Sequence, residues 1–520
     1  MLEDLLYLSL ESGNTIVSFT PPFAPHEIER YLDTIDFLDL SPSAQEAYNR
    51  ITRRLNPQAL LNLSADNYLF LLNINTTLEG RVRFNSDIPW YQRYTNDQSS
   101  HIPALVSIPF RFYFADSAQL HFEPIIAVNQ LFYNDGEYFG SNVPLYDIKN
   151  ADQNMPMRAY VAFGSYFWNF QLGRDRLSFG SGHMANLALS DNPQFYDFAR
   201  LSFFSDIFKY SVFVSQMPMD IRGIYDTTGI NENALVHTTQ RYFYMHRFDF
   251  LFLKKLSFTI TEGVMVGDSA LELRYLNPMM VFHSLYSWNN YPQWEGSSDY
   301  PDDGTGDMNG SLLSLELNYS IIKSLSVYGQ FVMNQFATSY KIDRWGTQPN
   351  GLGYLAGARY SGSFNGWGST FFFEFIYTDP YLYLNPSPFA SLINMRYLSG
   401  GISSLQYTYL GYPRDTIAIT TGARFFNRDK LFLYGEFTWL SQGEHDINWD
   451  WENTKEAYYE STPTGTAENN FILSFNVRYL LNSYLTFKCG LSGVYSVNNA
   501  HKPGSNIFGG QATASVSFCF

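Results

Sequence analysis

From about residue 66 to the C-terminus, apolar and polar residues alternate in runs that are typical of β-strands. In residues 313–320, Leu and Tyr occupy the odd positions, while Ser, Glu and Asn occupy the even ones. The same alternation recurs at 371–377, 431–439 and 471–479. Because a period of two places successive side chains on opposite faces of a strand, and charges recur on one face only, each strand is predicted to separate an apolar environment from a wet one.

The connections between the predicted strands alternate in length. Short turns are predicted at 115–117, 165–167, 205–207, 250–255, 321–324, 363–367, 427–429 and 482–484, and long segments at 87–103, 132–156, 179–195, 217–239, 283–310 and 441–469. If the last strand ends in the periplasm, every short turn falls on that side, provided that a further strand at about 391–399 is included. Short periplasmic turns and long external loops are typical of outer-membrane barrels. The architecture of a soluble sandwich does not require short and long connections to alternate in this way.

The pattern therefore predicts an all-β membrane protein, an antiparallel transmembrane β-barrel of about 18 strands within a range of about 16 to 20. The first 60 residues differ from the rest: 25–35 has the composition of a short helix, and Ser41 followed by Pro42 is a helix start signal before 44–55. We expect residues 1–60 to form a periplasmic helical segment, a candidate plug, and residues 61–520 to form an outer-membrane barrel with long extracellular loops.

The last strand supports this prediction, because a closed barrel pairs its last strand with its first. Val516, Phe518 and Phe520 lie on one side of it, opposite Ser515, Ser517 and Cys519. An aromatic C-terminal residue after apolar alternation resembles the signal that the outer-membrane barrel assembly machinery recognises. This machinery and the outer-membrane lipid are therefore expected partners.

Composition agrees with a barrel in the bacterial outer membrane. Aromatic residues make up 18% of the chain, yet the mean hydropathy is −0.20, and no run approaches the roughly 18 to 20 apolar residues of a spanning helix. The net charge of −16 and the lack of a Lys/Arg run argue against a nucleic-acid partner. Residues 1–14 lack a basic start and a sustained apolar run, so we expect a mature chain with an added Met.

The most distinctive internal stretch, residues 173–193, resembles the Wzi capsule-assembly family. It carries a Gly-Arg at Gly173 and Arg174, an aromatic-Gly-x-Gly at Phe179, Gly180 and Gly182, and a Leu-Ser-x-Asn ending in Ser190, Asp191 and Asn192. Phe179 stands where the family usually has Trp, and 275–286 is a second, looser similarity. The resemblance implies a barrel that binds or anchors surface polysaccharide.

The residues of this stretch allow two interpretations. Arg174 and Arg176 fall on one face with Ser178, at the outer end of a strand, and we expect that face to line the lumen. The arginines and the following loop could bind an acidic or hydroxyl-rich glycan. Alternatively, the glycines fold the loop into the lumen and the arginines pair with lumen carboxylates.

The long loops contain a second set of candidate glycan contacts. Trp288, Trp294, Trp449 and Trp451 are interspersed with Asp, Asn and Tyr. Aromatic faces stack on sugar C–H faces, although the same residues could pack loop on loop or form an aromatic girdle.

Catalysis, metal and cofactor sites find little support. His183 with Ser181 and Asp191 is the only local nucleophile-like grouping, and the acidic run at 302–307 lacks the later Glu of a calcium loop. We therefore expect no enzyme activity, no metal and no cofactor. The alternatives to a polysaccharide-binding barrel are a porin or specific solute channel, and a barrel hydrolase.

Overall fold

The computed structural model describes residues 1–56, 59–85, 103–115, 117–128, 139–143, 151, 157–184, 186–193, 195–217, 240–267, 270–282, 309–335, 350–384, 390–397, 403–407, 414–445 and 460–520. Its helices are α1 (Leu2–Ser12), α2 (Pro25–Asp33) and α3 (Pro42–Leu55), with short 3-10 turns η1 (Phe37–Asp39), η6 (Leu273–Leu276) and η10 (Asn499–His501). Helix α3 starts where the sequence predicts, since the Ser41 hydroxyl accepts a hydrogen bond from the Ala44 amide and Pro42 is its first residue.

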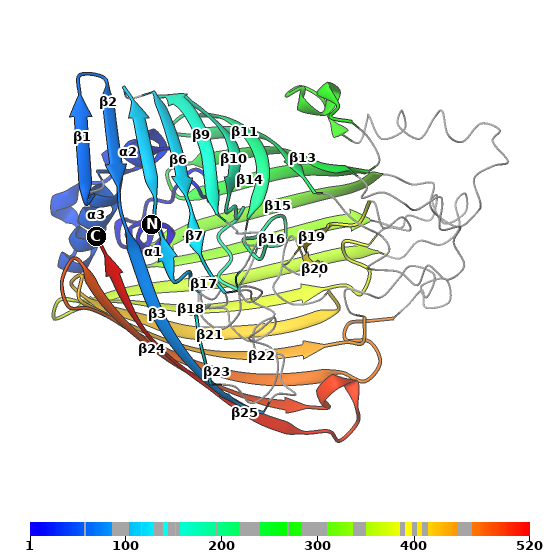
Figure 1. Cartoon of the computed structure of the whole chain (residues 1–520). Coiled ribbons are helices and arrows are strands. Elements are labelled where there is room, and N and C mark those ends of the chain that lie inside the picture. The colour runs from blue at the N-terminus through cyan, green and yellow to red at the C-terminus, as the bar shows by residue number, and fades with distance from the viewer. Residues whose placement is uncertain are drawn as a thin grey trace.

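The remaining elements are strands, and all of them except β19 and β20 form one large antiparallel sheet (Figure 1). They are β1 (Leu61–Ala65), β2 (Tyr68–Leu72), β3 (Asn75–Phe84), β4 (Val106–Ser107), β5 (Phe110–Phe114), β6 (Ala118–Glu123), β7 (Ile125–Ile126), β8 (Phe139–Ser141), β9 (Arg158–Ser165), β10 (Trp168–Asp175), β11 (Tyr196–Phe204), β12 (Phe208–Gln216), β13 (Arg241–Phe252), β14 (Leu256–Gly267), β15 (Asn309–Ile322), β16 (Leu325–Gln335), β17 (Gly351–Phe364), β18 (Trp367–Thr378), β19 (Ile393–Tyr397), β20 (Ser403–Tyr407), β21 (Thr416–Asn427), β22 (Leu431–Gln442), β23 (Glu468–Leu480), β24 (Leu485–Val497) and β25 (Ile507–Cys519).

The pairings of these strands close on themselves. Each strand from β9 to β18 and from β21 to β25 pairs with the next, and β25 pairs with β3, so that Val516 lies opposite Leu78. Among the described residues the circuit has eighteen members: β2 with β3, β4 with β5, β6 with β7, the ten strands from β9 to β18, and the five from β21 to β25. The predicted barrel, with its last strand paired to its first, is confirmed.

One predicted strand is not part of the barrel. Residues 391–399 were expected to cross between β18 and β21, but β18 pairs directly with β21 along its whole length. Within the predicted range, β19 pairs only with β20, in a separate two-stranded sheet. Without this strand, the short turns still fall at one end of the barrel and the long connections at the other, because β18 runs toward the loop end and β21 runs back from it.

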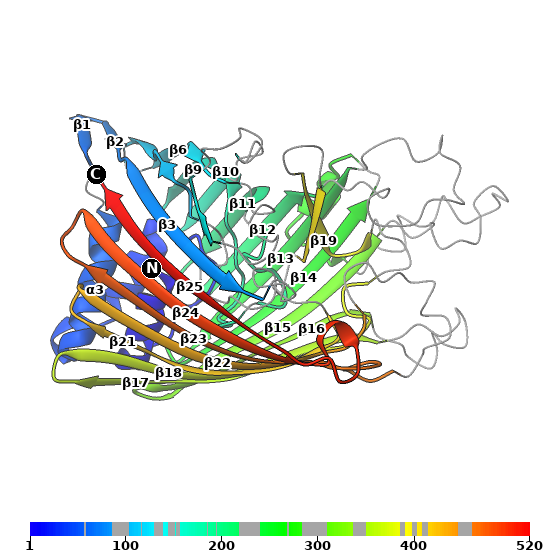
Figure 2. The ribbon, with the colours of Figure 1, turned by 60° about the horizontal axis from the view of Figure 1, so that its bottom comes forward.

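The short turns gather at one end of the barrel, together with the N-terminal helices (Figures 1 and 2). The Leu10 carbonyl accepts a hydrogen bond from the Ser324 amide of the β15–β16 turn (2.7 Å). The Thr15 amide donates to the Lys254 carbonyl of the β13–β14 turn (2.8 Å). The helices share a small apolar core that closes on Phe426 of β21. We call this end the short-turn end and the opposite one the loop end.

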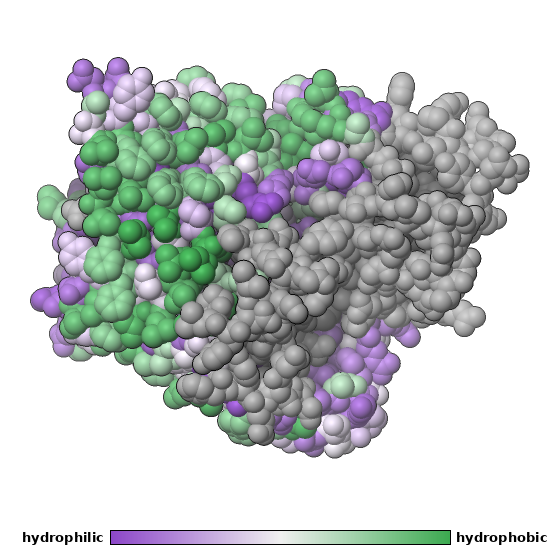
Figure 3. Space-filling view, viewed as in Figure 1, coloured by the Kyte–Doolittle hydropathy of each residue, from purple (hydrophilic) through white to green (hydrophobic). Residues whose placement is uncertain are grey.

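The outer face of the barrel is apolar in a band beside the short-turn end (Figure 3). Large exposed side chains of this face include Phe373, Phe437, Leu473, Phe475 and Leu491. The alternate positions on the same strands carry buried polar groups such as Glu374, Glu436 and Asn470. Charges therefore face the lumen, as the alternation predicts. In the described part of the chain, no helix has the length and apolar character needed to cross a membrane.

Candidate functional site

Two segments of the chain enter the lumen from opposite ends. From the short-turn end comes the stretch between α1 and α2, in which Ser18, Phe19 and Thr20 are buried. Lumen-facing side chains hold it: Arg200 donates to the Pro22 carbonyl (2.6 Å) and Lys209 donates to the Thr20 hydroxyl (2.9 Å). Lys209 also pairs with Glu27 of α2 at 2.6 Å. Buried cations thus tie the N-terminal segment to the barrel wall.

From the loop end comes the connection between β10 and β11, residues 176–193, which we call the inward loop. The Phe179 amide donates to the Leu189 carbonyl (2.9 Å), so the loop folds back on itself inside the barrel. The Gly180 amide donates to the Phe19 carbonyl at 2.8 Å. The two inserted segments therefore meet in the lumen. Gly180 has a φ of +133°, and an added Cβ would lie 2.3 Å from the Asn186 side chain, so only glycine fits there.

The tip of the inward loop is fixed to the far wall by carboxylates. Glu374 of β18 accepts from the backbone amides of His183 (2.6 Å) and Met184 (2.8 Å). The His183 ring lies 2.7 Å from a carboxylate oxygen of Glu436 on β22 and 3.0 Å from the hydroxyl of Tyr434. His183 thus positions the loop. Ser181 contacts Asn318 instead, and Asp191 is exposed, so these three residues do not form a catalytic set.

A second group of polar side chains supports the middle of the loop. Gln330 of β16 accepts from the Leu187 amide (2.5 Å) and donates to Glu316 (2.8 Å). Glu316 in turn pairs with Arg247 at 2.6 Å, and Arg247 pairs with Asp249 at 2.9 Å. All of these groups are buried, and a buried charge is tolerated when it is paired and hydrogen-bonded.

Around these anchors the lumen is filled by apolar side chains. The inward loop contributes Leu177, Phe179, Met184, Leu187, Ala188 and Leu189, and the wall contributes residues such as Phe213, Phe243, Leu312, Val332, Leu355 and Ile376. We call this region, from β11 through β18, the filled side of the lumen. In the described part of the chain, this apolar core fills the space between the inward loop and that wall.

Those residues singled out from the sequence that the structure describes do not gather in one surface site. Phe179, Gly180 and Ser190 are buried in the inward loop. The Gly182 amide donates a hydrogen bond to the Asn186 side chain (2.9 Å). Asp191 is exposed and Asn192 half-buried near the mouth, where Arg176 is also exposed. The motif that carries the family resemblance thus builds the inward fold. Trp288, Trp294, Trp449 and Trp451 lie outside the described residues.

The expectation that Arg174 faces the lumen is wrong. Arg174 has the same parity on β10 as Leu172, which is 49% exposed on the outer face. Its guanidinium forms two hydrogen bonds with Asp197 of β11 (2.7 and 2.8 Å) and lies 4.0 Å from the centre of the Phe195 ring. Leu172 and Arg174 alternate regularly with the buried inward residues Gln171 and Asp175. Arg174 therefore belongs to the outer rim.

The opposite wall, β22 to β25, carries small polar residues toward the lumen, and we call it the polar side. Ser474 and Ser492 face each other across β23 and β24 (Oγ–Oγ 3.1 Å), and Asn476 and Thr513 are half-buried. Lys488, nearer the short-turn end, is exposed. These side chains keep contact with solvent, unlike their counterparts on the filled side.

The polar side ends at the loop end in three polar residues that the sequence analysis missed. Gln442 closes β22, Asn470 lies near the start of β23, and Ser496 lies directly opposite Asn470 on β24. Each has an exposed fraction of 0%. Within the part of the chain that the structure describes, both amide atoms of Gln442, the Oδ1 of Asn470 and the Oγ of Ser496 lack a hydrogen-bond partner. We call these residues the buried polar row.

Two ordered connections pack at this end of the wall. Asp415, directly before β21, accepts from the Thr464 amide (3.2 Å) and hydroxyl (2.5 Å). Burial raises the pKa of Asp415, and these hydrogen bonds oppose the rise. The β24–β25 connection contains η10, whose Ala500 amide donates to Glu468 at 2.7 Å. Glu468 lies directly opposite Gln442 and also accepts from Asn470 (2.9 Å).

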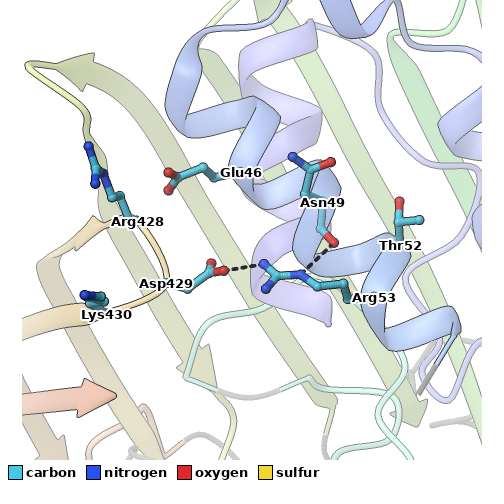
Figure 4. A pocket seen from close by; sticks show the side chains of 7 residues that line it. All are labelled: Glu46, Asn49, Thr52, Arg53, Arg428, Asp429 and Lys430. Carbon is cyan, nitrogen blue, oxygen red and sulfur yellow. Dashed lines mark hydrogen bonds and ion pairs between the residues drawn. The ribbon is translucent and has the colours of Figure 1, made fainter. Parts of the chain in front are cut away.

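At the short-turn end, α3 and the β21–β22 turn enclose a cleft of about 590 Å³ (Figure 4). Its lining residues are Glu46, Asn49, Thr52, Arg53, Arg428, Asp429 and Lys430. Asp429 contacts Arg53 and also pairs with Arg50 at 3.2 Å, so one carboxylate joins the turn to two arginines of the helix. Burial, and then the nearby Asp429, raises the pKa of Glu46. The described residues include no group of three or more His, Cys, Asp or Glu placed to hold a metal ion.

Comparison with known proteins places this architecture. A family model for the capsule assembly protein Wzi matches residues 89–400, which is more than half of the chain. The chain belongs to the Wzi family. Wzi of Escherichia coli, described as an outer membrane protein involved in group 1 capsule assembly and a carbohydrate-binding β-barrel, has a TM-score of 0.56 and 13% identity over 99% of this chain and 97% of its own.

Other outer-membrane proteins are less similar to this Wzi-family member. OprD of Pseudomonas aeruginosa has a TM-score of 0.40 and 8% identity over 87% of this chain and 95% of its own. The outer membrane channel DcaP of Acinetobacter baumannii has a TM-score of 0.39 and 7% identity over 89% and 100%. No curated protein sequence matches the chain. The predicted family, fold class and outer-membrane location are confirmed.

Proposed function

We propose that this Wzi-family barrel binds surface polysaccharide at its loop end and does not conduct solutes. The observation that carries the proposal is the meeting of the two inserted segments at Gly180 and Phe19, inside a lumen that the inward loop fills with apolar side chains. A porin needs a continuous aqueous path, and this core removes the filled side of the lumen from such a path. The Escherichia coli relative described as a carbohydrate-binding barrel supports the choice of ligand.

Two measurements on the full chain test this function. In a planar bilayer, the protein should show no steady ohmic conductance. In solution, the detergent-solubilised barrel should bind fluorescently labelled surface polysaccharide purified from its host strain, measured by anisotropy. Conductance without polysaccharide binding would instead establish the porin alternative.

We further propose that residues 1–60 act as a periplasmic plug. The support is the set of contacts between this segment and the barrel: Lys209 with Glu27, Arg200 with Pro22, and Asp429 with α3. Deleting residues 1–60 should raise bilayer conductance, and the inward loop should limit that rise. If the truncated barrel is folded and its conductance is unchanged, the segment is no plug.

The aromatic loops remain candidates for glycan contact. We propose that Trp288, Trp294, Trp449 and Trp451 stack on sugar rings, together with the exposed Arg176 and Asp191 at the mouth. Replacing the four tryptophans by alanine should weaken polysaccharide binding by at least about tenfold, since stacking contributes roughly 0.5 to 1.5 kcal/mol per aromatic pair. Trp367→Ala, in β18 beside a short turn, is the matched control.

The protein is proposed to be non-enzymatic. The supporting observation is that His183 contacts Glu436, while Ser181 contacts Asn318. Incubating the folded protein with the polysaccharide and following its length by gel filtration would test this. Shortened chains that disappear in a heat-denatured control would establish a hydrolase.

We also propose that Val516, Phe518 and Phe520 present the signal read by the barrel assembly machinery. Phe518 and Phe520 are 40% and 45% exposed on the outer face, whereas Ser517 contacts Thr77 across the β25–β3 seam (2.9 Å). Phe520→Asp should lower the amount of folded, heat-modifiable protein in the outer membrane more than Ser517→Asp. Equal losses would remove the terminal-signal interpretation.

A further inference from the structure

We propose that the buried polar row, Gln442, Asn470 and Ser496, is a subsite for one neutral sugar residue of the bound polysaccharide. This inference rests on the proposed function, and it adds a location and a chemical class to it. The three residues lie on the lumen faces of β22, β23 and β24, at the strand ends where the loops begin. They form one patch, because Asn470 faces Ser496 directly and Gln442 faces Glu468, two residues before Asn470.

The unpaired atoms of the row point to a ligand. Folded proteins satisfy nearly all buried polar groups, and a fully buried donor or acceptor without a partner is destabilising. Four atoms of the row are buried and have no hydrogen-bond partner among the described residues: the two amide atoms of Gln442, Asn470 Oδ1 and Ser496 Oγ. Three such residues on three neighbouring strands are hard to explain by folding alone, because apolar residues of equal size would be more stable there.

The chemistry of the row matches the hydroxyl groups of a sugar. The Gln442 amide offers a donor and an acceptor side by side, which two neighbouring hydroxyls can bond at once. Ser496 adds a hydroxyl, and Asn470 adds an acceptor oxygen whose orientation is fixed because its Nδ2 donates to Glu468 (2.9 Å). The row itself carries no charge, so its complement is a neutral hydroxyl-rich residue and not an acidic one.

A connection held in an unfavourable conformation lies beside the row, bonded to Glu468. In the β24–β25 connection, Asn498, Ala500 and His501 have φ values of 56°, 52° and 57°. Left-handed backbone is costly for residues other than glycine and is concentrated at binding sites. The connection is held down by the Ala500 amide on Glu468 (2.7 Å) and by His501 Nδ1–H on the Thr466 carbonyl (2.9 Å).

Two substitutions test the subsite without disturbing known contacts. Gln442→Met keeps the length of the side chain and removes the amide, and Ser496→Ala removes only the hydroxyl. Neither group has a partner among the described residues, so both variants should fold and melt at or above the wild-type temperature. The matched control is Ser314→Ala: Ser314 Oγ is equally buried and unpartnered, but it lies on β15, in the filled side.

Binding is measured by anisotropy with labelled polysaccharide from the host strain, per amount of folded, full-length protein. Each lost hydrogen bond should weaken binding about twofold to tenfold, so Gln442→Met should lose about tenfold and Ser496→Ala about threefold. Ser314→Ala should bind like wild type. Saturating polysaccharide should also raise the unfolding temperature of wild type more than that of Gln442→Met.

The outcomes separate the subsite from the proposed function. If wild type itself does not bind the polysaccharide, the proposed function fails. If wild type binds and both row variants bind equally well, the function stands and the subsite is wrong. A loss that Ser314→Ala shares, or a loss matched by a lower unfolding temperature, would also overturn the subsite.

Discussion

The two sides of the lumen are built on the same strand pattern but deal with their polar groups differently. On the filled side, charged residues such as Arg247 and Glu316 are buried and fully engaged with one another. On the polar side, several inward positions are small neutral residues such as Ser474 and Asn476, and these keep contact with solvent. Alternation predicts which residues point inward, but what they meet there depends on where a distant segment inserts.

The contrast has a simple electrostatic basis. Covering the wall with an apolar loop removes water, and a charge left there must find a partner of opposite sign. Where water remains, neutral hydroxyls and amides need no fixed partner. The buried polar row is the exception, since it lies on the polar side but is covered like the filled side.

The largest expected effect comes from removing a buried charge on the filled side. Arg247→Ala would leave Glu316 and Asp249 buried without their shared cation, at a cost of about 3 to 5 kcal/mol in the free energy of unfolding. Lys488→Ala on the polar side should change it little, because that side chain is exposed. Urea unfolding in lipid vesicles measures both. Equal losses would abolish the distinction between the two sides.

The next effect tests the apolar packing of the inward loop. Leu187 is 0% exposed, and Leu187→Ala should cost about 3 kcal/mol because it leaves a cavity. Asn476→Ala, on the polar side, should cost less than about 1 kcal/mol. Unfolding curves of the two variants would decide this. A small loss for Leu187→Ala would mean that the filled side is loosely packed.

A glycine substitution examines how the loop enters the lumen. Gly180→Ala places a methyl group 2.3 Å from Asn186 at a φ of +133°, and should cost about 1 to 3 kcal/mol. It should also make the loop accessible to added protease. Gly80→Ala, whose Cβ would meet no atom within 4 Å, is the control. If Gly180→Ala resists protease as well as the control does, the backbone at Gly180 can relax to accommodate the methyl group.

The smallest expected effect is a pH dependence at the loop end. The pKa of Asp415 is raised from its ordinary value of 3.8, chiefly by burial. The folded protein therefore favours protonated Asp415. Protonated Asp415 contributes fully to stability below the pKa of the unfolded state, and this contribution is lost as the pH rises through the pKa of the folded state. Asp415→Asn should flatten the change in unfolding free energy between pH 4 and pH 7 by less than about 1 kcal/mol. Asp39→Asn, on the exposed η1 turn, should leave it as in wild type.

Much of the barrel could be predicted because its causes are local. Period-two alternation fixed which face of β15 or β23 points inward, and the lengths of the turns placed the two ends. The pairing of β25 with β3 followed from the need for a closed edge. The strand at 391–399 was misplaced because a short β-like sequence pairs equally well in a side hairpin, and nothing local distinguishes the two.

The site was much less predictable. The motif around Phe179 and Gly180 was found, but its role in turning the chain into the lumen depends on contacts with Gln330, Glu374 and Phe19, which are distant in sequence. Arg174 was assigned to the wrong face because the sequence pattern grouped it with Arg176 and Ser178, which lie beyond the end of β10, whereas on the strand it shares the parity of the outward Leu172. The buried polar row gave no signal, since Gln, Asn and Ser are ordinary residues for a lumen wall and only their lack of partners distinguishes them.

The meeting of the two inserted segments also has a consequence for the order of events during assembly. The stretch around Phe19 and the inward loop both lie inside the ring that β25 and β3 close. The seam joins strands from the two ends of the chain, so its closure should be late and slow. In a barrel that closed early, both segments would have to enter through the two open ends of the ring.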